Sequence, residues 1–220
     1  MHHRVSNLLP GLHPLQLRIV GFRGATVPAL KIDGRRVQGS REISRVLDEL
    51  VPDPALFPDD PAARQAVEDA ERWGEQELQE VLRRIFRWVT AHRQPVRRWL
   101  GEVVGFPAPG VAGALNQPVA LAFARSSGAT EERVRADLAD LPRLLDRVDQ
   151  LLEEGVIGGE SPSAADFQIA SSIRLLMAFP QLRRQVESRP AGLLAVRLLE
   201  RFPEPVPADF PPAWLAPIRA

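Results

Sequence analysis

Four prolines between residues 52 and 61 separate two parts of the chain that have different hydrophobic patterns. Proline has no backbone N–H and interrupts both a helix interior and a central strand, so this segment predicts a linker. Before it, apolar residues occur in short runs that suit strands. After it, they recur every three to four residues, as on one face of a helix. We therefore predict an α/β domain over residues 1–51, a linker over residues 52–61 and an all-helical domain over residues 62–220. The boundary between the domains is expected near residue 56.

A β-hairpin followed by a helix is predicted in the first domain. The dipeptide Asp33-Gly34 stands between two short strand-like runs. It favours the positive φ angles of a tight turn, which predicts an antiparallel hairpin over residues 27–38. Ser40 precedes apolar residues spaced three and four apart and predicts a helix that Ser40 caps. Two weaker patterns predict a strand over residues 4–8 and a short helix over residues 13–20.

Long helices are predicted in the second domain. An apolar face indicates a helix over residues 62–92, and its members are Val67, Ala70, Gly74, Leu78, Val81, Ile85 and Val89. A second apolar stripe covers residues 134–152, where Pro142 is expected to kink or split the helix. The remaining expected elements are helices over residues 96–104, 117–126, 164–178 and 191–202, a loop between the first two, and an extended tail from residue 203 to Trp214.

The composition excludes several classes of chemistry. Twenty-eight basic and 28 acidic residues leave no net charge, which disfavours a nucleic-acid partner. The chain has no Cys and no Tyr, so it has no disulfide, no protein thiolate and no phenol for catalysis. The four histidines lack metal-ligand spacing, and no metal site is expected. No stretch approaches the roughly 20 apolar residues of a membrane helix, and the first residues do not match a signal peptide. We therefore expect a cytoplasmic protein that makes no membrane contact.

Two features of the first domain point to an anionic, peptide-like ligand. A cis Val27-Pro28 bond, which we predict, would leave the amide and carbonyl of Val27 facing outward. Ser40 at a helix N-terminus would add a hydroxyl and the positive end of a helix dipole, which suits a carboxylate. Residues 1–50 also carry eight basic and four acidic side chains. Each feature alone has a purely structural interpretation, but a proline turn, a hairpin and a serine-capped helix in this order are more specific.

Several motifs in this order resemble the glutathione S-transferase family. The resemblance runs from about residue 4 to residue 215. The residues that carry it are Val27-Pro28-Ala29-Leu30, Asp33-Gly34, Gly39-Ser40-Arg41-Glu42-Ile43 to Leu47, Leu56-Phe57-Pro58-Asp59-Asp60-Pro61 with Arg64 and Trp73, and Gly158 and Pro162 with Ser163-Ala164-Ala165-Asp166-Phe167.

The resemblance implies a thioredoxin-like N-terminal domain and an all-helical C-terminal domain. Val27, followed by Pro28, would pair its backbone with the cysteinyl part of glutathione, and Ser40 would hold the γ-glutamyl carboxylate. Gly39 departs from the family, which commonly has an acidic or amide residue there. The first strand and helix of the family are expected before Arg4 and are missing from this sequence. The Tyr, Ser or Cys that polarises the glutathione sulfur would lie between them.

Ser163 and Asp166 are interpreted as a structural capping box rather than as part of a catalytic triad. The serine hydroxyl would accept from the amide of Asp166, and the carboxylate would reach back to Ser163. By analogy with other helix caps, replacing Asp166 by Ala is expected to cost about 0.5 to 2 kcal/mol of stability.

Two functions follow from the resemblance. The first is a transferase that conjugates the glutathione thiolate to a small electrophile, provided that the activating segment is supplied. The second is a non-catalytic protein of the same fold that binds a ligand or partner without chemistry. In either case glutathione is the expected ligand, as co-substrate in the first, and the expected oligomer is a homodimer.

Overall fold

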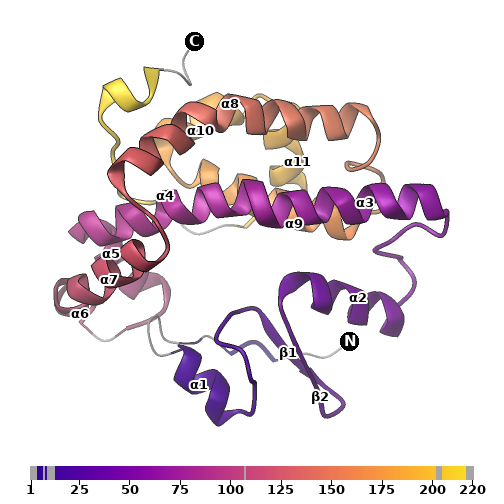
Figure 1. Ribbon diagram of the computed structural model, residues 1–220, viewed down its shortest axis with the longest axis horizontal. Helices are drawn as coiled ribbons and strands as arrows, with labels where there is room; N and C mark the ends of the chain where they lie inside the picture. Colours follow the sequence, from indigo (N-terminus) through magenta and orange to yellow (C-terminus); the bar gives the residue numbers. More distant parts are fainter. Residues whose placement is uncertain (1–3, 7, 9–12, 107, 202–204, 217–220) are drawn as a thin grey trace. The chain divides into compact units, whose positions relative to one another are not determined.

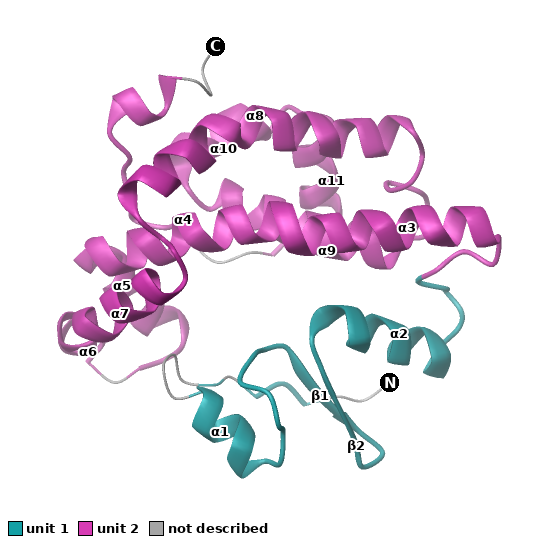
Figure 2. Ribbon diagram, in the orientation of Figure 1, with its two compact units in different colours: residues 1–56 teal, residues 57–220 magenta. Residues whose placement is uncertain are grey.

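The computed structural model describes residues 4–6, 8, 13–106, 108–201 and 205–216 (Figure 1). The chain divides into two compact units, which are residues 1–56 (unit 1) and residues 57–220 (unit 2) (Figure 2). The division falls inside the proline-rich segment over residues 52–61. Most of the described chain is helical, and its sheet is a single antiparallel pair of strands.

Unit 1 contains the predicted hairpin and the helices on either side of it. Its elements are α1 (His13–Ile19), β1 (Ala29–Ile32), β2 (Arg35–Gln38) and α2 (Ser40–Leu50). The strands pair from Ala29 opposite Gln38 to Ile32 opposite Arg35. Both residues of the intervening turn have positive φ, 46° at Asp33 and 82° at Gly34, as a two-residue hairpin turn of type I′ requires. The predicted hairpin and the short helix after residue 13 are therefore confirmed.

Two local predictions for unit 1 are wrong. Residues 4–6 and Leu8 form no strand, while Asn7 lies outside the described residues. Val5 is 75% exposed, so this stretch has no buried apolar face to hold it in a sheet. Ser40 is the first residue of α2 rather than its cap: the capping position belongs to Gly39, which has φ 95° and no side chain to offer.

A long helical stretch opens unit 2 and matches the helix predicted over residues 62–92. It consists of α3 (Pro61–Trp73), a π-helical turn η1 (Gly74–Leu78) and α4 (Gln79–His92), which follow one another without a break (Figure 1). All seven residues of the predicted apolar face are buried. A Cβ on Gly74 would lie 3.0 Å from Cγ1 of Ile169, so glycine allows a close approach between the π-helical turn and a neighbouring helix.

Much of unit 2 packs around one central helix, α9 (Ala164–Met177). The other elements after α4 are α5 (Gln94–Val103), α6 (Pro109–Leu115), α7 (Gln117–Ser126), α8 (Glu131–Glu153), α10 (Pro180–Val186), α11 (Pro190–Leu198) and the short 3-10 turn η2 (Pro212–Trp214). Helix α9 packs against α3, α4, α10 and α11, and α8 runs beside α4 (Figure 1). The apolar side chains of α9 therefore form the middle of the core.

The proline-containing stretches account for the differences from the predicted helices. Of the two predicted outcomes at Pro142, a kink or a split, the split is wrong, because α8 continues through the proline. Leu138, Leu141 and Leu145 are buried on either side of the proline, and this packing offsets the lost backbone hydrogen bond. Helix α6 lies where a loop was predicted, and Pro109 is its first residue. Proline suits this position, since the first backbone N–H of a helix has no helical partner.

Helix α10 was not predicted, and it also begins at a proline, Pro180. Helix α11 ends at Leu198 rather than at residue 202, which lies outside the described residues.

The predicted capping box at the start of α9 is present. The Ser163 hydroxyl accepts from the Asp166 amide, and the Asp166 carboxylate accepts from the Ser163 amide at 2.8 Å. The carboxylate also accepts from the Ser163 hydroxyl at 2.7 Å and from the Gly158 amide at 2.7 Å. Asp166 is only 1% exposed. The same carboxylate thus caps α9 and holds the loop before it.

The C-terminal segment packs onto unit 2 through alternating apolar side chains. Val206, Ala208 and Phe210 alternate along the chain and are buried, and Trp214 is buried as well. The Phe210 amide donates to Oε1 of Gln181 at 2.6 Å, and the Trp214 ring lies 5.1 Å from that of Trp88. Residues 205–211 have no helix or strand, as expected for an extended tail, and the 3-10 turn follows.

Candidate functional site

The four residues predicted to bind glutathione meet at one end of the hairpin in unit 1. Ala29 pairs with Gln38, so the residues before β1 lie beside the residues after β2. The Gly39 amide donates to the Pro28 carbonyl at 3.0 Å and continues this pairing by one step. Val27-Pro28 is cis, as predicted. Val27 and Ser40 therefore flank the same hydrogen-bonded pair.

Val27 offers its backbone at this end of the hairpin. The residue is 50% exposed, and its amide and carbonyl make no hydrogen bond with any other described residue. An extended ligand could pair with both groups in the way that one strand pairs with another. Because a ligand would supply bonds that this part of the chain does not, the backbone of Val27 is a candidate recognition element.

Gly39 places the beginning of α2 beside this backbone. Its φ of 95° lies in a region that residues with a Cβ rarely adopt, which explains why glycine stands at this turn. No side chain caps α2, and the Ser40 hydroxyl has no hydrogen-bond partner among the described residues. The first amides of α2 and this hydroxyl are consequently available as donors to an anion.

Two side chains of β2 anchor the loop that leads to Val27, and sequence reasoning missed both. Gln38 accepts from the Gly24 amide at 2.9 Å and donates to the Thr26 carbonyl at 2.8 Å. Arg36 donates to the Val20 carbonyl at 3.1 Å. Arg36 and Gln38 lie on either side of the buried Val37 in β2. Their spacing of two residues is the only signal in the sequence that their side chains share a face of the hairpin.

Ser163 and Asp166 belong to unit 2 and take no part in this site. Their hydrogen bonds are used within the capping box and the loop before it. This agrees with their interpretation as structural residues.

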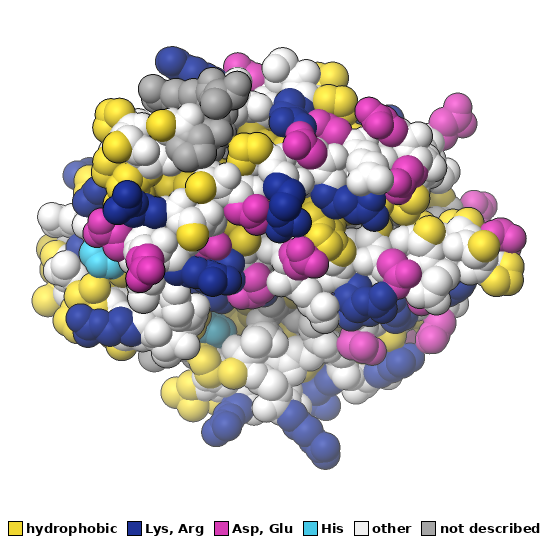
Figure 3. Space-filling view, turned by 45° about the horizontal axis from the view of Figure 1, so that its top comes forward, with side chains coloured by type: hydrophobic (Ala, Val, Ile, Leu, Met, Phe, Trp, Pro, Cys, Tyr) yellow, Lys and Arg dark blue, Asp and Glu magenta, His cyan; other side chains and the backbone are white. Residues whose placement is uncertain are grey.

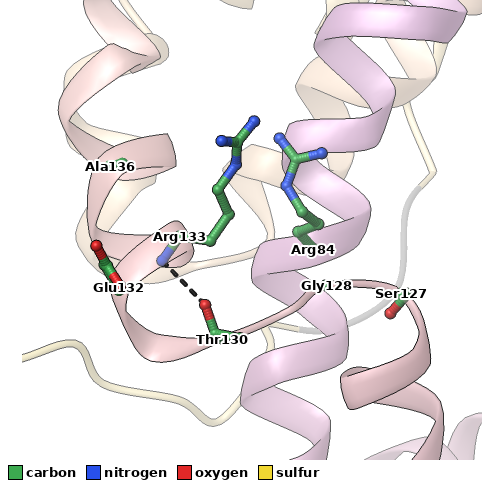
Figure 4. Close-up of a pocket in the computed structure, with 7 residues that line it drawn as sticks. All are labelled: Arg84, Ser127, Gly128, Thr130, Glu132, Arg133 and Ala136. Atoms are coloured by element: carbon green, nitrogen blue, oxygen red, sulfur yellow. Dashed lines mark hydrogen bonds between the residues drawn. The ribbon is translucent and has the colours of Figure 1, made fainter.

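A second candidate site is an open surface pocket in unit 2 (Figure 4). Its volume is about 590 Å³. Side chains come from α4, from the loop before α8 and from the first turns of α8, and the lining residues are Arg84, Ser127, Gly128, Thr130, Glu132, Arg133 and Ala136. In Figure 4 the guanidinium groups of Arg84 and Arg133 extend toward the same side of the pocket.

An ion pair orients one of these arginines. Nε and Nη2 of Arg84 each donate to the Asp137 carboxylate at 2.8 Å, and both side chains are largely buried. The hydrogen bonds from Arg84 to Asp137 raise the pKa of Arg84, against the effect of burial. This bidentate pair connects α4 to α8 and holds the Arg84 guanidinium in one orientation.

Basic and acidic side chains are interspersed across the middle of the face that Figure 3 shows. Among the described residues, no group of three or more His, Cys, Asp or Glu side chains could hold a metal ion. The described helices also include none with the length and apolar character to cross a membrane.

Comparison with known proteins identifies no relative of this chain: no family model, no curated protein and no solved structure matches it.

Proposed function

We propose that this chain is a glutathione S-transferase-like protein that binds glutathione in unit 1. The observation that carries the proposal is the unpaired backbone of Val27 beside the uncapped N-terminus of α2. Glutathione is a peptide with carboxylates at its ends. It therefore offers amide groups to a strand-like backbone and a negative charge to a helix N-terminus.

Each residue of this site has a distinct role in the proposal. Val27, held by the turn at Pro28, pairs with the cysteinyl part of the ligand. Ser40 donates its hydroxyl to the γ-glutamyl carboxylate together with the first amides of α2. Gly39 contributes the backbone angle that exposes these donors, and it supplies no side-chain contact.

The reaction that fits this ligand is attack of its thiolate on a small electrophile. The sulfur forms a bond to carbon, and the leaving group departs with the bonding electron pair. Lowering the thiol pKa needs a donor or a positive helix end beside the sulfur. The proposed transferase activity therefore requires an activating segment, which the resemblance places before Arg4.

A non-catalytic binding protein is the second candidate. The sequence contains no Tyr and no Cys, so the phenol and the thiol that the resemblance associates with activation are not available from these 220 residues. Binding of glutathione without turnover of an activated aryl halide would favour this candidate over the transferase.

Replacing Ser40 by Ala tests the site. Because the Ser40 hydroxyl makes no bond within the described residues, the expected change in folding stability is below about 0.5 kcal/mol. The loss of a hydrogen bond to a carboxylate is expected to weaken glutathione binding by about 1.5 to 3 kcal/mol, which is tenfold or more. Calorimetric titration measures the affinity, and thermal denaturation measures the stability.

Ser126→Ala is the matched control, since Ser126 is an exposed serine at the end of a helix in unit 2. It should leave glutathione binding unchanged. Failure of the parent chain to bind glutathione would overturn the proposal, and equal affinities of the parent and Ser40→Ala would remove Ser40 from the site.

The proposal also includes a homodimer and a cytoplasmic location, both of which the resemblance and the composition favour. Light scattering after size exclusion should give a mass of twice the 24.4 kDa of one chain. A mass of one chain at micromolar concentration would contradict the homodimer without affecting the ligand site.

A further inference from the structure

We propose that the pocket between α4 and the start of α8 binds the anionic group of a small ligand, either a carboxylate or a phosphate. The lining residues of this pocket all belong to unit 2. The inference therefore does not depend on glutathione binding in unit 1.

The first argument is that Arg84 is already oriented for a ligand. Its Nε and Nη2 are bound to Asp137, whereas Nη1 makes no hydrogen bond within the described residues. The side chain is 17% exposed, so little rotamer freedom remains to be lost when a ligand binds. A guanidinium held in this way can present Nη1 to an anion at low entropic cost.

The second argument is that Arg133 reaches the same carboxylate but is not held by it. Its Nε lies 3.9 Å from Oδ1 of Asp137, which is beyond hydrogen-bond range, and its side chain is 64% exposed. The guanidinium groups of Arg133 and Arg84 thus lie near one buried carboxylate, that of Asp137, and come from two different helices. Because the hydrogen bonds of Asp137 go to Arg84, a ligand anion can supply the hydrogen-bond partner that the Arg133 guanidinium lacks among the described residues.

The third argument is the balance of charge along α4. Burial lowers the pKa of Arg87, and the positive charges of Arg83 and Arg84 act in the same direction. Arg83, Arg84 and Arg87 lie close together on α4, where Glu80 forms ion pairs with Arg83 and Arg87. Arg133 of α8 lines the pocket together with Arg84, and the nearby acids are Glu132 and Asp137. An added anion would reduce the repulsion among the arginines.

Two further side chains of the pocket, Thr130 and Glu132, can contact a ligand. The Thr130 hydroxyl accepts from the Arg133 amide and keeps its own proton for a ligand. The Glu132 carboxylate at the rim can accept from a ligand hydroxyl or ammonium group. The expected ligand is consequently small, and carries one anionic group together with a hydroxyl or amino group.

The experiment is an NMR titration of the full ¹⁵N-labelled chain. Inorganic phosphate and acetate are added separately, with NaCl keeping the ionic strength constant. We expect at least one of the two anions to cause saturable shifts of the amides of residues 127–133 and of the Arg84 Nε–H. If only phosphate saturates the shifts, the site is assigned to phosphates. If acetate also saturates them, the site accepts carboxylates as well as phosphates. Shifts that rise linearly with concentration, or that spread evenly over the surface, overturn the proposal.

Two variants separate a specific site from a general charge effect. Arg133→Gln should weaken anion binding at least about tenfold, since it removes a charge-assisted hydrogen bond. Arg143→Gln makes the same change of charge on the same helix, at an exposed arginine paired with Asp140, and should leave binding unchanged. Unchanged binding by Arg133→Gln, or equal weakening by both variants, would overturn the proposal. Thermal denaturation checks that both variants are folded.

Discussion

Replacing Asp166 by Ala should destabilise the chain by about 4 kcal/mol, which is more than the loss of an ordinary helix cap. The carboxylate is 1% exposed and accepts from the amides of Gly158 and Ser163 and from the Ser163 hydroxyl. Alanine would leave these donors without a partner inside the protein, and bonds to a charged acceptor are worth more than neutral ones. Urea denaturation followed by circular dichroism measures the change in free energy.

Asp60→Ala provides the matched comparison. Asp60 caps α3 through one exposed hydrogen bond, from the Ala63 amide at 2.8 Å. Its loss should cost about 1 kcal/mol, as is typical of a surface cap. Similar losses for the two variants would show that water replaces the partners of Asp166, and the carboxylate would then be only a cap.

Replacing Arg97 by Met should be the second most destabilising change, at about 3 kcal/mol. The Arg97 guanidinium donates to the carbonyls of Thr90 and Ala91 in the last turn of α4 and to that of Gly113 in α6, at 2.8 to 2.9 Å. Carbonyls in the last turn of a helix have no helical partner, so Arg97 satisfies groups that would otherwise be buried alone. Methionine keeps the apolar length of the side chain and removes the donors.

Arg98→Met is the control for this change because Arg98 is the exposed neighbour on the same helix. Its partner is Glu102, and both side chains are about half exposed or more. A surface pair of this kind contributes little, and the expected change is within about 0.5 kcal/mol. A loss below about 1 kcal/mol for Arg97→Met would indicate that water reaches the three carbonyls and that Arg97 does not join α4 to α6.

The hairpin and the capping box could be predicted because their causes lie within a few residues of one another. Asp33 and Gly34 favour the positive φ angles that the turn requires, whatever the rest of the chain does. Ser163 and Asp166 satisfy backbone groups of the same turn of helix. The apolar face over residues 62–92 was also predictable, since a period of 3.6 places its members on one side.

Proline was the main source of error in the helical unit. It interrupts a helix interior, but the same ring suits the first turn of a helix, where no backbone donor is needed. Helices α6 and α10 begin at Pro109 and Pro180, whereas α8 continues through Pro142. The sequence alone does not distinguish these cases, because the outcome depends on whether packing compensates for the lost bond.

The candidate site in unit 1 could be predicted in part. Val27, Pro28, Gly39 and Ser40 were identified from the order of local motifs, and the hairpin register brings them together. The role of Ser40 as a cap was wrong, since the backbone angle of Gly39 shifts the start of α2 by one residue.

The sequence by itself determined where the chain turns, where its helices have an apolar side, and which chemistry is excluded by the missing Cys and Tyr. These properties depend on residue type and on spacing within a few positions. The tertiary structure alone decided the contacts between distant segments. Arg84 meets Asp137, which lies 53 residues away, and Arg97 binds carbonyls from two other helices. The physical reason is that a charged side chain finds its buried partner through the packing of helices, and no local pattern in the sequence records that packing.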